Sequence, residues 1–252
     1  MTAFNGPGAD AGSDHADLPA HADEPHAGGV GETLNWLRAG VLGADDGIVS
    51  TAGILVGVAA ATIDRGAIFT AGIAALAAGA VSMALGEYVS VSTQRDTERA
   101  LIRKERAELR DMPEEEFDEL VGLYRDRGLS ESTARQVATE LTEHDALAAH
   151  AEVELGIDPD TLTNPWHAAG SSAASFTLGA ALPLIAILVL PQHIRIPVTF
   201  VVVCLALALT GWISARIGQA DARLAILRVT MGGALAMTIT YLIGLATGHV
   251  VG

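Results

Sequence analysis

Two adjacent carboxylates, Asp45 and Asp46, lie inside an apolar stretch over residues 39–62 that reads AGVLGADDGIVSTAGILVGVAAAT. The stretch is long enough to cross a bilayer, because a hydrocarbon core of roughly 30 Å needs about 20 helical residues. Acidic side chains at that depth are costly, so they are rare and usually face a cavity, a partner or an ion path. The pair therefore predicts a membrane protein with an ion or proton site.

A second apolar stretch, residues 66–92, carries two further candidate ligands for that site. Met83 and Glu87 are four residues apart, so they share one face of a helix. Asp45 and Asp46 point about 100° apart on a helix, so one can be a ligand while the other lies at a helix seam or end. If Met83 and Glu87 face Asp46, a thioether and two acids form a mixed site suited to a transition metal, and the acids can exchange protons for the ion.

The polar block over residues 94–165 contains a second group of candidate ligands. It has 19 Asp and Glu but nine Lys and Arg, and its apolar residues recur at helical intervals. We expect three helices there: an extension of the second apolar stretch to about residue 110, then 113–127, then 131–155. Several acids and histidines are three or four residues apart and so share helix faces: Glu105 with Glu108, Glu116 with Glu119, Glu140 with Glu143 and His144, and His150 with Glu154.

Two interpretations of this spacing remain open. The acidic faces can be solvated and salt-bridged by neighbouring Arg and Lys, or the three helices can fold together and aim their acids at shared divalent cations. Carboxylate oxygens suit hard divalent cations, whereas His favours Fe, Zn, Ni and Cu over Ca and Mg. An acid-rich site with an occasional His or Met therefore points to Fe²⁺ or Mn²⁺ as the bound ion.

The composition indicates a membrane protein whose polar and apolar residues are segregated along the chain. The 252 residues have a mean hydropathy of +0.37 and a formal charge of −15, with the acidity concentrated in the polar block and the N-terminal tail. Nucleic acid is excluded as a partner, because binding its phosphates needs a basic surface. The lone Cys204 excludes a disulfide framework and a Cys-rich zinc site.

Five apolar segments, over residues 39–62, 66–92, 168–190, 194–217 and 225–249, predict an all-α five-helix transmembrane bundle. We expect a cytoplasmic three-helix domain inserted between its second and third helices, which is a metal-binding domain if its acids face shared cations. We expect a disordered, acidic, His-containing tail over residues 1–31, transmembrane helices over 32–93 and 166–252, and the inserted domain over 94–165. Glycine pairs four residues apart either pack the bundle or form a dimer seam on the first segment: Gly43/Gly47, Gly53/Gly57 and Gly244/Gly248.

The basic residues predict the orientation of the chain. With five crossings and the N-terminus inside, 13 of the 15 Lys and Arg fall on the inner side, and only Arg65 and Arg195 fall outside. Short loops rich in Lys and Arg stay in the cytoplasm. We therefore expect a multi-pass protein of the cell membrane with a cytoplasmic N-terminus and polar block and an extracytoplasmic C-terminus.

Four stretches, in order, resemble the vacuolar iron transporter family: LRAGVLGADDGIVSTAGILVGVAAA, GAVSMALGEYVSVSTQRDTE, AHAEVELGI and SSAASFTLGAALPLI. The resemblance extends from about residue 33 to the C-terminus. It implies a homodimer with a translocation path between the two first helices, and a cytoplasmic three-helix domain that binds metal. It also implies export of Fe²⁺, and often Mn²⁺, from the cytosol in exchange for protons, with no prosthetic group.

Residue by residue, the resemblance matches the family's first-helix Asp to Asp46 and its second-helix Met to Met83. Its cytoplasmic carboxylates match Glu98, Glu105, Glu108, Glu116, Glu119 and Glu154. Two positions depart from the pattern. Ala75 stands where some members have an acid, and His150 with the following Ala replaces a Met pair, so His150 can take over as a ligand. A short Ala/Gly-rich chain of this kind looks bacterial, which makes the plasma membrane its expected location.

Two rival functions remain beside transport. A membrane-anchored sensor or store would bind ions in the polar block without conducting them, but it has no use for a membrane-embedded acid such as Asp46. A di-iron carboxylate enzyme requires paired Glu-x-x-His motifs, and the closest sequence, Glu140 to His144, is spaced by four. We therefore expect a secondary transporter, not an enzyme: a proton-coupled exporter of Fe²⁺ or Mn²⁺ for metal homeostasis.

Overall fold

The computed structural model describes residues 29–159 and 161–251, so the tail predicted over residues 1–31 lies almost wholly outside the described residues. Within these ranges every regular element is a helix, which confirms the all-α prediction. The elements are α1 (Gly29–Ala61), α2 (Arg65–Asp111), α3 (Pro113–Asp126), α4 (Glu131–His150), the π-helical turn η1 (Ala151–Leu155), α5 (Pro165–Val189), α6 (Arg195–Ile217) and α7 (Ala222–Val251).

Five of the described helices, α1, α2, α5, α6 and α7, are long and apolar enough to cross a membrane. They coincide with the five apolar segments predicted from the sequence. Large apolar side chains such as Leu178, Leu205 and Leu235 are exposed on their outer faces. Such surfaces are unfavourable in water but not in lipid. The chain is therefore a multi-pass membrane protein, and the five-segment prediction is confirmed.

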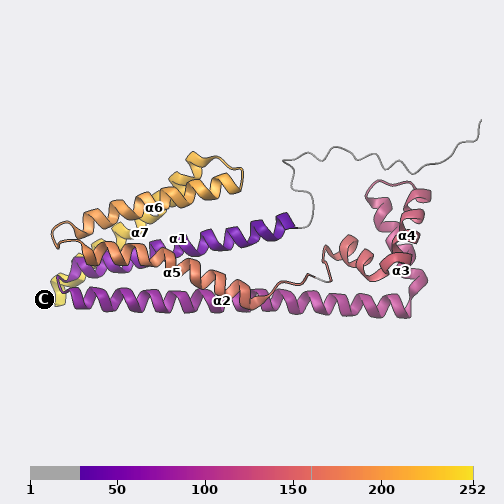
Figure 1. The fold of residues 1–252 in the computed structure, drawn as a ribbon, viewed down its shortest axis with the longest axis horizontal. Helices are drawn as coiled ribbons and strands as arrows, with labels where there is room; N and C mark the ends of the chain where they lie inside the picture. Colours follow the sequence, from indigo (N-terminus) through magenta and orange to yellow (C-terminus); the bar gives the residue numbers. More distant parts are fainter. Residues whose placement is uncertain (1–28, 160, 252) are drawn as a thin grey trace, which may run out of the picture.

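Helix α1 is the centre of the bundle, because it packs against α2, α5, α6 and α7 (Figure 1). Two of its crossings bring backbones into near contact. A Cβ atom added to Gly179 of α5 would collide with the Ala44 carbonyl of α1, and one added to Gly244 of α7 would collide with the Gly57 carbonyl. The glycine pairs therefore pack the helices within one chain, as small residues do in membrane bundles.

Helix α2 is much longer than a membrane requires. Its 47 residues rise about 70 Å at 1.5 Å per residue, and in Figure 1 it runs nearly the full length of the molecule. Only its first half, to about Ser92, is apolar. The second half extends beyond the bundle and carries α3 and α4, and we call the described residues of 94–162 the polar end.

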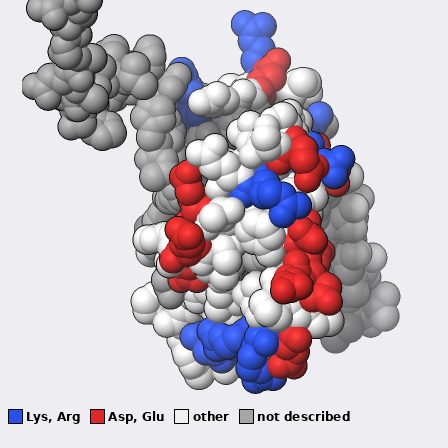
Figure 2. Space-filling model, turned by 90° about the vertical axis from the view of Figure 1, so that its right-hand side faces the viewer, with Lys and Arg blue, Asp and Glu red and all other residues white. Residues whose placement is uncertain are grey.

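The polar end has a small core of its own. Leu120 and Val121 of α3 pack against Ala134, Ala138 and Ala149 of α4, with Phe117, Tyr124, Leu141 and Val153 around them. Charged side chains of both signs are spread over its outer surface among uncharged residues, and several acids lie beside bases (Figure 2). The apolar periodicity predicted that these helices would have apolar faces, because residues at helical intervals form one face. The alanines of α4 that fill this core were not predicted.

The segment predicted as one helix over residues 131–155 is in fact interrupted. Asp145 has extended backbone angles (φ −160°, ψ 97°), and its carboxylate accepts a hydrogen bond from the Ala148 amide at 2.9 Å. Helix α4 is then followed by the π-helical turn η1, which is capped by Gly156, where φ is 65°. Asp competes with helical hydrogen bonds by capping nearby amides, which explains the break. This break changes the direction of the residues after Asp145.

Arginine side chains join the connections at the opposite end of the bundle. The buried Arg195 of α6 donates to the Thr62 carbonyl at 3.0 Å and to the Ile63 carbonyl at 3.5 Å, while Arg65 donates to the Leu190 carbonyl at 3.2 Å. The α1–α2 turn and the α5–α6 turn are therefore tied together. These are the two arginines that the charge distribution placed apart from all the others.

Candidate metal-binding sites

The polar end brings three acids around one buried histidine. Nδ1 of His150, at the end of α4, lies 3.0 Å from Glu105 Oε1 of α2, 3.7 Å from Glu116 Oε2 of α3 and 4.0 Å from Glu154 Oε2 of η1. We call these four residues the Glu–His cluster. Candidate ligand atoms of Glu105, His150 and Glu154 all lie within 4.8 Å of one another, so one ion can reach all three.

The chemistry of the Glu–His cluster fits a cation. Glu105 and His150 are 3% and 1% exposed, and neither Glu105 Oε1 nor His150 Nδ1 makes a hydrogen bond within the described part of the chain. Buried polar atoms without a partner are costly, and so they need an explanation. Two such atoms facing each other, with further carboxylates beside them, form a donor set of the kind that divalent transition metals prefer.

The electrostatics of the cluster favour exchange between protons and a cation. Burial, together with the charges of Glu154, Glu116, Glu108 and Glu119, raises the pKa of Glu105 to about 7. Burial likewise raises the pKa of Glu116 and lowers the pKa of His150. These groups lie beyond the apolar half of α2. A bound divalent cation would stabilise the ionised carboxylates and displace their protons.

Two local distortions position His150 and Glu154, the last two residues of the cluster. The break at Asp145 turns the end of α4 toward α2, where α4 and η1 both contact that helix. The π-helical geometry of η1 then sets Glu154 relative to His150, and such π-turns are frequent at functional sites. Arg127 of the α3–α4 connection donates to the Val153 carbonyl at 2.9 Å and so holds the turn in place.

The other acids predicted as ligands lie at the edge of the cluster or outside it. Glu108 is paired with Lys104 at 2.6 Å, and Glu119 is exposed on α3, but both act electrostatically on Glu105. Glu98 accepts a hydrogen bond from Gln94 at 2.8 Å. Glu143 is exposed on α4, ahead of the break at Asp145. Of the sequence candidates, Glu105, Glu116, His150 and Glu154 are brought together, whereas Glu98 and Glu143 are not.

A second site lies in the membrane-spanning part. A groove of about 350 Å³ is lined by Asp46 of α1 and Met83 of α2. The other lining residues are Ser50 and Ile54 of α1, Ala75, Ala78, Gly79 and Ser82 of α2, and Phe176 of α5. Glu87, one turn beyond Met83, is not among them. Asp46 and Met83 therefore share one groove, as their predicted roles require, and Glu87 does not join them.

The two adjacent acids of α1 diverge. Asp46 is exposed along the groove, whereas the half-buried Asp45 accepts a hydrogen bond from Thr210 of α6. Thr210 and Ser50 were not among the predicted site residues. Thr210 had no local signal, because it lies 165 residues from Asp45. Ser50 follows Asp46 by four residues, so helical spacing could have identified it as a neighbour in the groove.

The chain is similar over most of its length to members of one transporter family. A profile of the VIT family matches residues 37–245. A vacuolar iron transporter of Acanthamoeba castellanii is 44% identical over 90% of this chain and 84% of its own length. Vacuolar iron transporter homolog 1 of Arabidopsis thaliana is 34% identical over 91% and 92% of the two chains. Vacuolar iron transporter homolog 5 of rice is 35% identical over 89% and 88%.

Proposed function

The chain belongs to the VIT family, whose members are transporters and not enzymes, and on this premise we propose that it carries Fe²⁺ across a membrane. The observation that supports this most directly is the groove shared by Asp46 and Met83. It combines a carboxylate and a thioether from two neighbouring spans. Oxygen and soft sulfur donors together suit a transition metal better than Mg²⁺ or Ca²⁺.

The exposure of Asp46 supports a homodimer. A carboxylate that faces lipid is unfavourable, so a membrane-embedded acid needs a cavity or a partner. Asp46, Ser50 and Ile54 are spaced by four on α1, and all three line the open groove. In our proposal a second copy covers this groove, so that two Asp46 carboxylates flank one path along the α1 helices.

The polar end supports the proposed direction of transport and its proposed coupling to protons. It carries most of the basic residues, and so the positive-inside rule favours a cytoplasmic location. There the Glu–His cluster would capture Fe²⁺, or Mn²⁺ with the same donors, ahead of the groove. Because the pKa of Glu105 is about 7, its proton can be released and regained near neutral pH. We therefore propose export from the cytosol in exchange for protons.

One alternative has structural support. The Glu–His cluster is complete within a single chain and lies beyond the apolar half of α2. A metal sensor or store would need this cluster alone. The two functions differ in whether metal ions pass through the groove. The test must therefore separate metal binding from metal flux.

The experiment compares variants in proteoliposomes that enclose a metal-sensitive dye. Asp46→Asn should reduce Fe²⁺ flux at least tenfold and leave binding at the polar end unchanged, whereas Met83→Leu should reduce flux less. Glu143→Gln removes an exposed acid outside both sites and is the matched control. Metal binding without flux in the wild-type protein would favour the sensor, and full flux through Asp46→Asn would refute the proposed path.

A further inference from the structure

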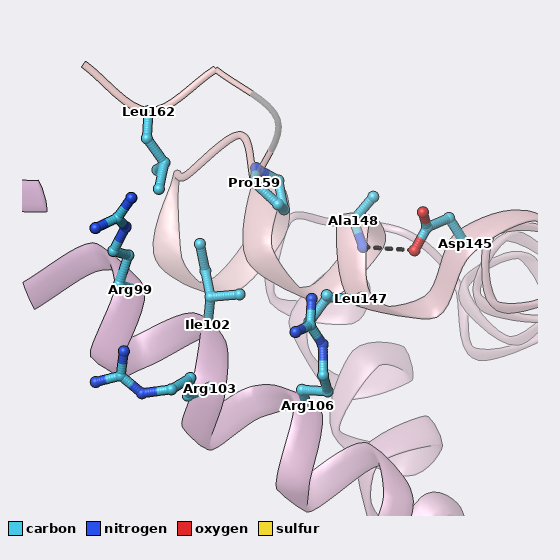
Figure 3. Close-up of a pocket in the computed structure, with 9 residues that line it drawn as sticks. All are labelled: Arg99, Ile102, Arg103, Arg106, Asp145, Leu147, Ala148, Pro159 and Leu162. Atoms are coloured by element: carbon cyan, nitrogen blue, oxygen red, sulfur yellow. Dashed lines mark hydrogen bonds between the residues drawn. The ribbon is translucent and has the colours of Figure 1, made fainter. Parts of the chain in front are cut away.

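A second pocket at the polar end has a character opposite to that of the Glu–His cluster. It occupies about 330 Å³ between α2, the end of α4 and the connection to α5. Arg99, Arg103 and Arg106 of α2 line one side, and the remaining wall includes Ile102, Leu147 and Leu162 (Figure 3). The arginines are spaced by four and three residues, so they share a face of α2 that lies roughly opposite Glu105 and Glu108.

These three arginines lack the ion pairs and hydrogen bonds that four other arginines of the polar end make, namely Arg110, Arg125, Arg127 and Arg135. Arg110 pairs with Asp111 at 2.7 Å, and Arg125 pairs with Glu131 at 3.0 Å. None of Arg99, Arg103 and Arg106 makes an ion pair or hydrogen bond within the described part of the chain. The block has 19 acids against nine bases, so three neighbouring arginines without an acidic partner are unexpected.

The acid that lines the pocket does not neutralise them. One carboxylate oxygen of Asp145 is held by the Ala148 amide, and Figure 3 places this carboxylate at the end of the pocket remote from the Arg99 guanidinium. Arg99 and Arg106 extend their guanidinium groups toward the pocket, whereas that of Arg103 points away from the apolar inner wall (Figure 3). Guanidinium groups present planar sets of N–H donors that match phosphate oxygens.

We propose that this pocket binds the phosphate group of an anionic ligand. The apolar wall accepts the carbon portion of such a ligand, and the occupant would tie the connection between η1 and α5 to α2. Arg99 lies seven residues beyond Ser92, which is about 10 Å along the helix. The pocket is therefore close to where the apolar half of α2 leaves the membrane. Both the headgroup of an anionic lipid and a soluble phosphate can supply the same chemistry there.

The test uses the full chain and one matched pair of variants. Arg106→Gln removes a charge from the pocket, and Arg110→Gln removes the same charge from the same helix outside it. Inorganic phosphate is titrated into the protein in detergent by calorimetry. In a separate arm, retention of phosphatidic acid against phosphatidylcholine is measured by native mass spectrometry after exchange into mixed micelles.

Binding of either probe should weaken roughly tenfold or more in Arg106→Gln and stay within about twofold in Arg110→Gln. Phosphate binding identifies a soluble source, and selective retention of phosphatidic acid identifies a lipid source. The proposal is overturned if neither probe binds the wild-type chain, or if both variants weaken binding equally. Equal weakening would mean that only the overall charge of the surface attracts the anion.

Discussion

Replacing Glu105 by Gln should weaken metal binding at the Glu–His cluster and remove most of its pH dependence. Glu105 is the acid that lies nearest to Nδ1 of His150, at 3.0 Å, and it is almost completely buried. Gln keeps the size of the side chain but cannot ionise. The change therefore removes the titrating charge with little change in packing.

The magnitude follows from the pKa of about 7 that burial and the neighbouring acids give Glu105. At pH 8 about 90% of these carboxyls are ionised, and at pH 6 only about 10% are. If the cation binds the ionised form, the apparent affinity should fall about tenfold between pH 8 and pH 6. Burial also raises the pKa of Glu116, so its protonation should lower the metal affinity further as the pH falls.

The raised pKa of Glu105 also predicts how the stability of the metal-free protein depends on pH. The usual pKa of a Glu side chain is 4.5, and the folded chain holds this proton to about pH 7. Between these values the folded state binds more protons than the unfolded state, so stability decreases as pH rises and then levels off. The total loss is about 3 kcal/mol, and Glu105→Gln should abolish it.

The assay titrates Mn²⁺, which is stable in air, into the full chain in detergent at pH 6, 7 and 8 by calorimetry. Thermal unfolding with a chelator present gives the metal-free stability at the same pH values. Glu143→Gln serves as the control, because it removes an exposed acid of α4 outside the cluster. A Glu105→Gln protein that kept the wild-type pH dependence of binding and stability would refute this account of the site.

The bundle itself yields two further predictions. Gly179→Ala should destabilise the protein by about 1–3 kcal/mol, because its Cβ would collide with the Ala44 carbonyl. Gly170→Ala on the same helix meets nothing within 4 Å, and equal melting temperatures for the two variants would contradict the close α1–α5 packing. Arg195→Gln should cost about 1–3 kcal/mol, because the hydrogen bonds from this buried guanidinium to the Thr62 and Ile63 carbonyls of the α1–α2 turn are lost. Thermal unfolding in detergent measures this loss of stability. An unchanged melting temperature in Arg195→Gln would mean that the arginine does not tie the two turns together.

Local patterns in the sequence predicted most of the elements. Hydropathy identified the five spans, because a segment that must satisfy its backbone in lipid becomes a long apolar helix. Helical spacing also located the helices of the polar end. It predicted that Asp45 and Asp46 would diverge, since adjacent positions of any helix point in different directions. It paired His150 with Glu154, which are one turn apart on the chain.

Contacts between distant segments decided which side chains meet. Spacing could not separate Glu105 and Glu116, which enter the Glu–His cluster, from Glu143, which does not, because all three lie on helices with similar patterns. The break at Asp145 and the π-turn after His150 reorient the last candidate ligands, which meet Glu105 and Glu116 because α4 and η1 pack against α2 and α3. Likewise, the partner of Asp45 is a threonine 165 residues away. Periodicity records only the neighbours of a residue along its own helix, whereas a site is made where several helices cross.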